Sequence, residues 1–409
     1  MNNILKQSSW LFLAQVVGRG IGLFYTIFLA RNLGVSDFGL YSAALAYYSL
    51  FAALADFGFS RFLVREIARG SLKIAEVFSN ITILRLTITS LLFAAFSLAL
   101  YIFDPDKFRV SLTLLTVMTV LPLSITQTVD SIFIAMQKMK LSAISLVALN
   151  IATIITGVFL INSGFGVTGA AVALIFGQLV YLIILVLFLK MQKKPLLAIV
   201  RTKTLKQAVV GSLPYGLLAI LGLIYFRIDT LMLSYLRGNF ETGIYSAGYK
   251  FLEALIFIPN SLAIVLFPTL AKLHEHNLAK IKLLFSQSIK IMVFLSVLVF
   301  IAYNLILPPF IRFFLPNYLP SIEVIRILSL AIPFIFIYVP LSQILLSTDK
   351  YLKQVILISL LPLCSNIILN LIFIPRFGFL GASWITVASD VLSTAIVLIF
   401  IKRLVFKHG

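Results

Sequence analysis

The chain has 409 residues, of which 61% are hydrophobic and only 11% are charged, and its formal net charge is +19. Soluble domains carry roughly 25% charged residues, so this composition excludes a water-soluble globule or a string of soluble domains. The positive charge does not indicate a nucleic-acid-binding protein, because no basic domain or aromatic-interleaved basic patch accompanies it. The single cysteine, Cys364, excludes a disulfide framework and a cysteine-based metal site.

Apolar runs of about 20 residues, the length that crosses a bilayer as a helix, follow one another along the whole chain. The first run comes after Lys6, is too long for a signal sequence and has no small-residue cleavage site after it, so we interpret it as a retained helix. The runs are also too long and too uniformly apolar for the strands of a membrane barrel. We predict an all-α polytopic membrane protein with about twelve transmembrane helices, at residues 9–30, 40–60, 79–103, 111–136, 142–162, 168–189, 208–236, 243–270, 287–309, 324–347, 353–374 and 380–401.

The charges between these spans predict their orientation. Of the 33 Lys and Arg residues, 21 lie in one set of connections, which includes both termini, and 7 lie in the opposite set. Positively charged loops stay on the cytoplasmic side, so both termini are predicted to be cytoplasmic and the protein to be a multi-pass component of the inner membrane. The excess of Lys and Arg in the cytoplasmic connections accounts for the positive net charge and favours contact with anionic lipid headgroups.

The two halves of the chain repeat each other. Segments 34–43 and 238–247 share the pattern Gly-x-x-acid-x-Gly-x-Tyr-Ser-Ala, and segments 165–170 and 377–382 share Phe-Gly-x-x-Gly-Ala. Each half holds six predicted spans, which predicts six-helix bundles at 1–200 and 201–409. Because each half has an even number of spans, both repeats have the same orientation in the membrane. This arrangement predicts a central cavity and a substrate path between the two repeats, with transport by alternating access.

Ionisable residues within the predicted spans are the candidates for function, because a charge at the bilayer centre costs roughly 2.5–3.5 kcal/mol and usually faces a cavity or a partner. Arg19 is the most central, flanked by Gly18 and Gly20. It is predicted either to bind a phosphate bidentately or to pair with an acid on another helix. The remaining basic candidates for substrate binding are Arg85, which is close enough to the cytoplasmic end to snorkel, Arg227 and Lys250.

The acidic candidates are coupling sites or ion-pair partners. Asp229 lies two residues from Arg227, so the two side chains point to different sides of the helix and do not neutralise each other. Glu253 is three residues from Lys250, a spacing that suits a local pair. Asp390 lies in the middle of the last span. Asp130 lies near the cytoplasmic end of its span, and Asp56 and Lys290 lie near the cytoplasmic ends of theirs.

No constellation of an enzyme is found: the sequence has no Walker loop, no Gly-x-Ser-x-Gly elbow and no His-Glu-x-x-His. No catalytic residue, cofactor or metal site is predicted, and the three histidines fall in polar segments outside the spans. Without a nucleotide-binding loop, ion or substrate gradients are expected to supply the energy for transport.

The first helix-loop-helix resembles the opening signature of the polysaccharide biosynthesis (Wzx-type O-antigen flippase) family. The resemblance is carried by residues 28–41 (Phe-Leu-Ala-Arg-Asn-Leu-Gly-Val-Ser-Asp-Phe-Gly-Leu-Tyr), 56–60 (Asp-Phe-Gly-Phe-Ser) and 63–69 (Leu-Val-Arg-Glu-Ile-Ala-Arg). The Gly-x-x-Gly-Ala tails of both halves and the twelve predicted spans agree with it.

The resemblance implies membership of the multidrug/oligosaccharidyl-lipid/polysaccharide exporter (MOP) superfamily. It implies a flippase that moves a polyprenyl-pyrophosphate-linked oligosaccharide, an O-antigen or other surface polysaccharide repeat unit, to the outer leaflet. Basic residues of a central cavity would bind the pyrophosphate, with polymerase and glycosyltransferases of the same pathway as possible partners. The alternative is a cation-coupled multidrug or small-solute exporter of the same superfamily. A membrane-embedded glycosyltransferase or polymerase is disfavoured, because the longest connections have about 17 residues.

Overall fold

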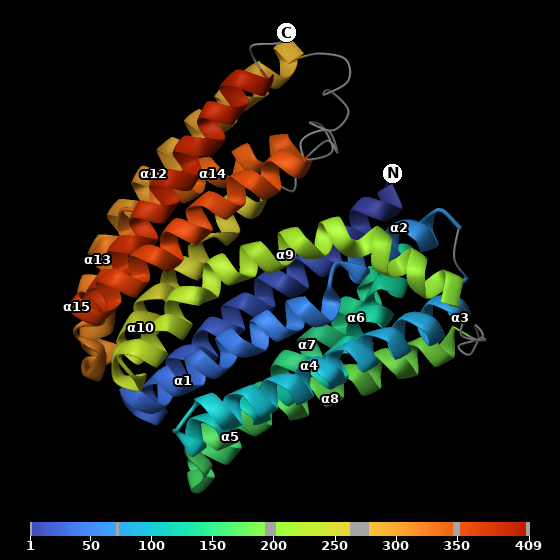
Figure 1. Cartoon of the computed structure of the whole chain (residues 1–409), viewed down its shortest axis with the longest axis horizontal. Helices are drawn as coiled ribbons and strands as arrows, with labels where there is room; N and C mark the ends of the chain where they lie inside the picture. The colour runs from blue at the N-terminus through green and yellow to red at the C-terminus, as the bar shows by residue number, and fades with distance from the viewer. Residues whose placement is uncertain (1, 71–72, 193–201, 262–277, 347–351, 406–409) are drawn as a thin grey trace. The chain divides into compact units, whose positions relative to one another are not determined.

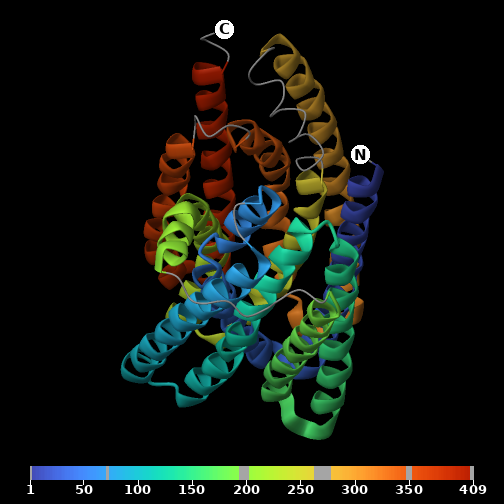
Figure 2. The same cartoon turned by 90° about the vertical axis from the view of Figure 1, so that its right-hand side faces the viewer.

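The computed structural model describes residues 2–70, 73–192, 202–261, 278–346 and 352–405, and these residues form helices joined by short turns, with no strand among them (Figures 1 and 2). The chain separates into two compact units, Met1–Arg227 (unit 1) and Ile228–Gly409 (unit 2). The division falls inside α9 (Thr202–Leu236). The predicted boundary between residues 200 and 201 lies outside the described residues.

Single glycines fold the longest helices back on themselves. α1 (Asn2–Asp56) has 55 residues, or about 80 Å at the rise of an α-helix, far more than a bilayer core of about 30 Å. Gly34 interrupts it with φ 77° and ψ 172°, a conformation open to glycine but strained for other residues, and Figure 1 shows the chain reversing its direction after the first leg of α1. The expected loop at 31–39 is therefore helical except at this glycine.

The same backbone conformations recur in the second half. Gly238, which begins α10 (Asn239–Leu255), has φ 86° and ψ −176°, close to the values at Gly34. Gly378 interrupts α15 (Leu352–Phe400) with φ 57° and ψ −135°, and Gly166 has φ 51° and ψ −137°. These are the glycines that the sequence repeats align, so the shared patterns encode shared turns.

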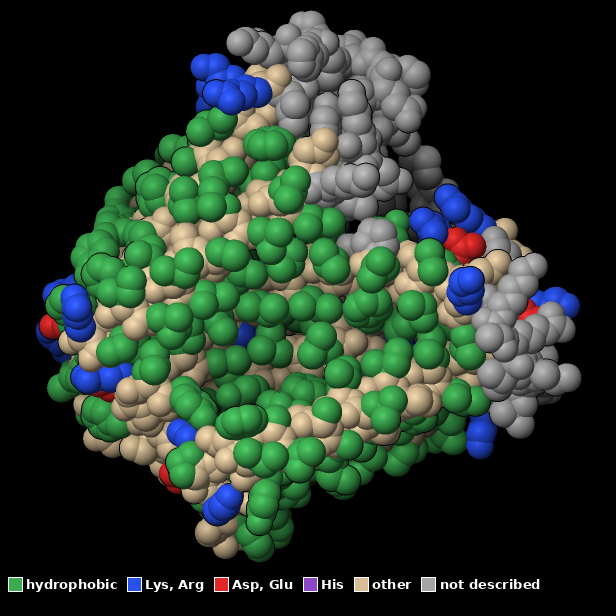
Figure 3. Space-filling view, in the orientation of Figure 1, with side chains coloured by type: hydrophobic (Ala, Val, Ile, Leu, Met, Phe, Trp, Pro, Cys, Tyr) green, Lys and Arg blue, Asp and Glu red, His purple; other side chains and the backbone are tan. Residues whose placement is uncertain are grey.

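Seven described helical segments are long and apolar enough to cross a membrane, or eight if the bent pair described below counts as one span. Three of them, Leu13–Ala68, Met139–Met191 and Gln354–Arg403, have 50 residues or more, and each contains one of the reversing glycines. The polytopic all-α class is confirmed, and the number of twelve spans stays a prediction. Figure 3 shows hydrophobic side chains over most of the visible face, with Lys and Arg gathered toward its ends.

Unit 1 is built on the pairing of α7 (Met139–Leu160) with α8 (Gly166–Met191), which the π-turn η2 (Ile161–Phe165) joins. α1 packs against α7 and α5 (Lys107–Met118). α6 (Val120–Ala135) packs against α8, against α4 (Thr82–Phe103), which follows η1 (Val77–Ile81), and against α2 (Phe59–Ala68). The buried core between these helices and α9 contains Phe59, Phe62, Leu63, Val77, Ile81, Val129, Ile132, Phe133, Tyr181, Leu185, Leu189 and Ala208.

The predicted span 40–60 is wrong at its end, because the chain leaves α1 at Asp56 and turns into α2 through Phe57 and Gly58, both with positive φ. The reason is a backbone-to-backbone contact with α9. A Cβ built on Gly58 would lie 2.5 Å from the amide nitrogen of Gly216, and one on Gly216 would lie 2.5 Å from the carbonyl oxygen of Phe57. Only glycine fits at either position.

This contact predicts a sharp difference between two glycines of α9. Gly216→Ala forces a methyl group onto the Phe57 backbone and is expected to lower the free energy of unfolding by about 2–3 kcal/mol. Gly222 has no atom within 4 Å of its Cβ position, so Gly222→Ala is expected to be neutral or slightly stabilising. Thermal unfolding of the purified variants in detergent measures both, and equal melting temperatures for the two variants would contradict the packing described.

Unit 2 packs α10 against α13 (Ser321–Ser329) and α15, and α12 (Leu278–Phe314) against α13 and α14 (Ile332–Leu346). Gly248 brings α10 close to α13, since its Cβ would lie 2.7 Å from Val324. The predicted span 324–347 is bent by 51° between α13 and α14. Pro333 lies in the first turn of α14 and has no amide hydrogen to bond to the preceding turn, which accounts for the bend.

Candidate functional site

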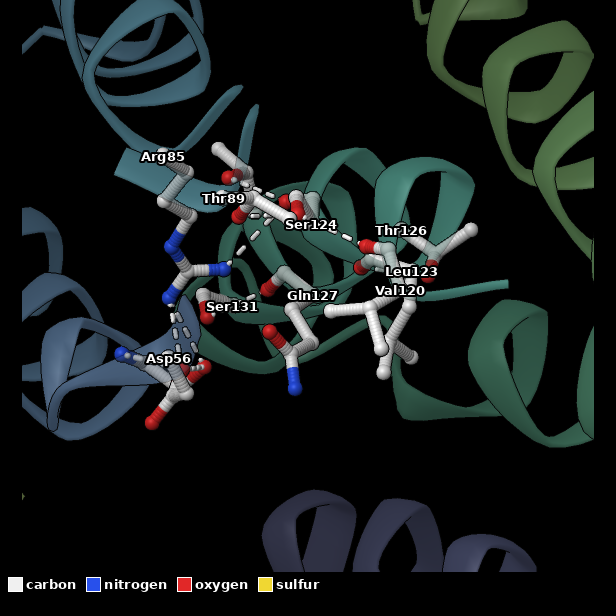
Figure 4. Close-up of polar contacts among 11 residues, drawn as sticks. Asp56, Arg85, Thr89, Val120, Leu123, Ser124, Thr126, Gln127 and Ser131 are labelled. Atoms are coloured by element: carbon white, nitrogen blue, oxygen red, sulfur yellow. Dashed lines mark hydrogen bonds and ion pairs between the residues drawn. The ribbon is translucent and has the colours of Figure 1, made fainter. Parts of the chain in front are cut away.

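Arg85 lies in a buried polar cluster of unit 1 that Figure 4 draws. The side chain is completely buried, and its Nη2 donates to Asp56 Oδ1 at 2.7 Å and to Ser60 Oγ at 3.0 Å. Nη1 donates to the carbonyl oxygen of Ser124 on α6 at 3.5 Å. The guanidinium carbon also lies 5.6 Å from the centroid of the Phe59 ring.

This ion pair joins α1, α4 and α6. Arg85, predicted as a substrate-binding candidate close enough to the cytoplasmic end to snorkel, is instead buried and paired with Asp56. The α4 helix places Arg85 four residues before Thr89, whose hydroxyl lies 3.0 Å from Ser124 Oγ and extends the same polar seam. A buried charge that keeps its partner is tolerated, whereas one without it is strongly destabilising. We assign Arg85 to this ion pair and leave it out of the substrate site proposed below.

Asp229 is the centre of a second polar cluster, which lies entirely in unit 2. Its carboxylate is 5% exposed. Oδ2 accepts hydrogen bonds from Thr386 Oγ1 at 2.7 Å and from the Tyr245 hydroxyl at 3.2 Å, and Oδ1 accepts one from Asn370 Nδ2 at 2.6 Å. Asp229 forms no ion pair with Lys or Arg in the described part of the chain. A buried carboxylate is thus held by neutral groups alone.

Asparagines on α15 extend this cluster. Asn370 Nδ2 also donates to Asn366 Oδ1 at 3.0 Å, and Asn366 Nδ2 donates to Ser389 Oγ at 3.2 Å. The Asn370 Oδ1 atom is buried without a hydrogen-bond partner. Carboxylate, amide and hydroxyl oxygens are the ligands of hard cations, so the cluster has the donor atoms for a monovalent cation or a proton.

Sequence reasoning identified Asp229 but missed the three residues that donate to it, Thr386, Tyr245 and Asn370, and the neighbouring Asn366. The signal was present for two of them: Asn366 and Asn370 are four residues apart in an apolar span, which places both on one helix face. Tyr245 and Thr386 carry no such signal, because single hydroxyl-bearing residues are common in membrane helices. Their role depends on the packing of α9, α10 and α15.

The remaining predicted residues are dispersed. Arg19 lies on the first leg of α1 with an exposed side chain, and Arg227 lies on α9 and is partly buried. Lys250 Nζ and Glu253 Oε2 are 2.9 Å apart on α10, forming the local pair that their spacing suggested. Asp130 on α6 accepts a hydrogen bond from the Tyr181 hydroxyl. Asp390 is partly buried on α15, one turn after Thr386.

Comparisons with known protein families and relatives were made for the whole sequence. The polysaccharide biosynthesis protein family matches residues 4–274, and the MatE family matches residues 214–373. An uncharacterized membrane protein, MJ1375, of Methanocaldococcus jannaschii is 27% identical over 199 residues, which cover 48% of this chain and 46% of that protein. The match therefore spans about half the length of that relative.

Two solved structures show the fold over nearly the whole chain. The inward closed conformation of the lipid II flippase MurJ matches 96% of this chain and 87% of its own, with 19% identity and a TM-score of 0.75. An inward-facing multidrug resistance MATE family transporter of the MOP superfamily matches 95% of this chain and 94% of its own, with 14% identity and a TM-score of 0.78. These two solved structures are of a flippase and a transporter, and the polysaccharide biosynthesis protein family covers more than half of the sequence. The chain therefore belongs to the polysaccharide biosynthesis protein family.

Proposed function

We propose that the protein flips a polyprenyl-pyrophosphate-linked oligosaccharide, an O-antigen or other surface polysaccharide repeat unit, from the cytoplasmic to the outer leaflet of the inner membrane. The observation that carries the substrate class is Arg19, an exposed guanidinium in the middle of the first apolar helix. A charge placed there is too costly to face lipid tails, and we infer that it lines a water-filled path. A planar guanidinium suits the bidentate recognition of a pyrophosphate.

Arg227 is proposed as the second pyrophosphate ligand, because it lies in the helix of the second half that corresponds to the helix of Arg19. Lys250 is a weaker candidate, since its ammonium group already pairs with Glu253. The coupling step is proposed at Asp229, where exchange of a proton or a monovalent cation would change the charge of a buried cluster. The cytoplasmic position of both termini and the pathway's polymerase and glycosyltransferases as partners remain part of this proposal.

The test is translocation of a fluorescent polyprenyl-pyrophosphate oligosaccharide between the leaflets of proteoliposomes. Arg19→Ala and Arg227→Ala are each expected to reduce the rate at least about tenfold, because each removes a charge-assisted bidentate contact of about 1.5–3 kcal/mol. Arg19→Lys is expected to recover only part of the rate that Arg19→Ala loses, since a lysine keeps the positive charge but lacks the planar guanidinium that makes two parallel hydrogen bonds. Arg31→Ala, at another exposed arginine of α1, is the matched control and is expected to flip normally.

A cation-coupled exporter of drugs or small solutes is the second candidate, and the Asp229 cluster together with the MatE match over residues 214–373 favours it. The two candidates separate in one experiment with the same proteoliposomes. Cation-driven efflux of a dye, with no flipping of any lipid-linked sugar by the native protein, would overturn the flippase in favour of the exporter. Flipping that persists in both arginine variants would keep the function and make those arginines structural.

A further inference from the structure

Glu241 joins two turns of unit 2 that are far apart along the chain. It lies in the first turn of α10, just after the glycine turn at Gly238, and its carboxylate reaches the glycine turn at Gly378 of α15. Oε2 accepts a hydrogen bond from the Phe379 amide at 2.9 Å, and Oε1 accepts one from Arg237 Nε at 2.8 Å. Both carboxylate oxygens are therefore engaged, and such charge-assisted bonds are stronger than neutral ones.

Arg237 extends this contact to the first leg of α15. It follows the last residue of α9, and its Nη1 donates to the carbonyl oxygen of Pro375 at 3.5 Å. The Arg237–Glu241 pair thus contacts α15 on both sides of its glycine turn, at Pro375 before it and at Phe379 after it. We call these four residues the clamp.

The clamp joins α9 and α10, two of the helices that form the Asp229 cluster. Asp229 lies eight residues before Arg237, and Tyr245, which donates to the Asp229 carboxylate, lies one turn after Glu241. These separations correspond to about 12 Å and 6 Å at the rise of an α-helix. A shift of α10 against α9 at the clamp therefore changes the distance between Tyr245 and Asp229.

The clamp also holds both legs of α15, and each leg contributes one donor to Asp229. Asn370 is on the first leg, five residues before Pro375, and Thr386 is on the second leg, seven residues after Phe379. The two donors bond to different oxygen atoms of one carboxylate, so their distances depend on the angle between the legs. The bonds of the clamp on either side of the turn fix this angle.

Unit 1 repeats the turns but not the clamp. Asp37 occupies the position of Glu241 in the repeated segment, yet it has no hydrogen bond or ion pair within the described residues. A Cβ at Gly166 would meet no atom within 4 Å, whereas a Cβ at Gly378, the matching glycine, would overlap the Glu241 carboxylate. The space that the Glu241 carboxylate fills in unit 2 is therefore open in unit 1.

Unit 1 also lacks the buried carboxylate. The offset of 204 residues between the segments that begin at Gly34 and Gly238 places Tyr25 where unit 2 has Asp229. A clamp that only braced a glycine turn would be needed in both halves, because the turns share their backbone conformation. Its presence only in the half with the carboxylate indicates that it serves the Asp229 cluster.

We propose that Glu241 is a positioning residue of the Asp229 cluster. Its carboxylate fixes the ends of α9, α10 and α15 against one another and so fixes the hydroxyl and amide groups that bond to Asp229. Resting on the coupling role proposed for Asp229, this assigns to Glu241 the setting of how tightly the cluster binds its cation or proton. Asp229 itself exchanges the ion, and Glu241 acts through its partners.

The test is the initial rate of transport in proteoliposomes, of the fluorescent lipid-linked oligosaccharide or of the dye, titrated with sodium at fixed pH and with protons at fixed sodium. In Glu241→Ala, the ion concentration for half-maximal stimulation is expected to rise at least about fivefold, while the maximal rate is kept because Asp229 is still present. Glu241→Gln is expected to restore part of the apparent affinity, since its amide oxygen still accepts from Phe379 but lacks the charge.

A matched pair of glycines separates positioning from a general loss of stability. Gly378→Ala and Gly166→Ala place a side chain at similar positive φ, 57° and 51°, so both strain the backbone. Only Gly378→Ala displaces the Glu241 carboxylate, and only it is expected to raise the half-maximal ion concentration. Thermal unfolding in detergent measures the stability of both variants.

Two outcomes would overturn the inference, and they differ in what they leave standing. A native protein that responds to neither gradient would remove the coupling role of Asp229 and this inference with it. A native response that Glu241→Ala and Gly378→Ala leave unchanged, or one that Gly166→Ala alters equally, would overturn the positioning role of Glu241 alone.

Discussion

Asp229→Asn is expected to abolish gradient-driven transport while the fold survives. Asparagine has the size of aspartate but no charge, and removing a buried carboxylate that only neutral groups hold costs little stability. Thr386 and Tyr245 carry rotatable hydroxyl groups, which can turn to accept from the new amide. What is lost is the ability of the cluster to bind and release a cation or a proton. The stimulation of transport by an imposed gradient should fall at least about tenfold.

The measurement is the initial rate in proteoliposomes with and without sodium and proton gradients, together with the melting temperature in detergent. Glu253→Gln is the matched control, because Glu253 is in the same unit, within a partly exposed pair with Lys250, and is expected to keep the gradient response. Thr386→Val should give an intermediate effect, since one hydrogen bond to a charged group contributes about 1.5–3 kcal/mol. A native gradient response in Asp229→Asn would show that coupling occurs elsewhere.

Arg85→Met is expected to be among the most destabilising single substitutions in unit 1. It leaves Asp56 without its guanidinium partner, and breaking a buried ion pair from one side costs about 3–5 kcal/mol. Asp56→Asn is expected to cost a similar amount for the complementary reason. The double variant removes both charges and should recover most of the loss, because neither partner is then left as an uncompensated buried charge.

A double-mutant cycle measured by denaturant or thermal unfolding in detergent tests this expectation. The Lys250–Glu253 pair provides the comparison, since its side chains are 25% and 34% exposed and three residues apart on one helix. Its coupling energy should be only about 0.2–0.5 kcal/mol. Additive losses at Arg85 and Asp56 would mean that the two side chains do not act as a pair.

The sequence was sufficient for the class of the fold and for the position of the reversing turns. Long apolar runs can satisfy their backbone in a bilayer only as helices, and Gly34, Gly166, Gly238 and Gly378 mark turns because other residues resist their backbone conformations. The sequence overestimated the length of the connections, since a single glycine reverses a helix within one or two residues. It also missed the turn at Gly58, whose cause is a contact with Gly216 more than 150 residues away.

The candidate sites could be predicted only as isolated charges. Asp229 stood out because a carboxylate in an apolar span is rare, but its partners Asn370 and Thr386 are 141 and 157 residues away along the chain. Periodicity within one helix contains no information on such contacts. For the same reason Arg85 was predicted as a substrate-binding candidate, although its partner Asp56 lies only 29 residues earlier on the preceding long helix.

The tight turn between α7 and α8 has a consequence for how the protein enters the membrane. Residues 161–166 contain no charged side chain, and a π-helical turn with Gly164 and Gly166 at positive φ connects the two helices. A hairpin of this kind presents no long polar loop to the translocation machinery, so its two helices can partition into the lipid together. The closely paired hairpin would then be complete before later parts of the chain leave the ribosome, and it would serve as a template on which α1 and α6 assemble.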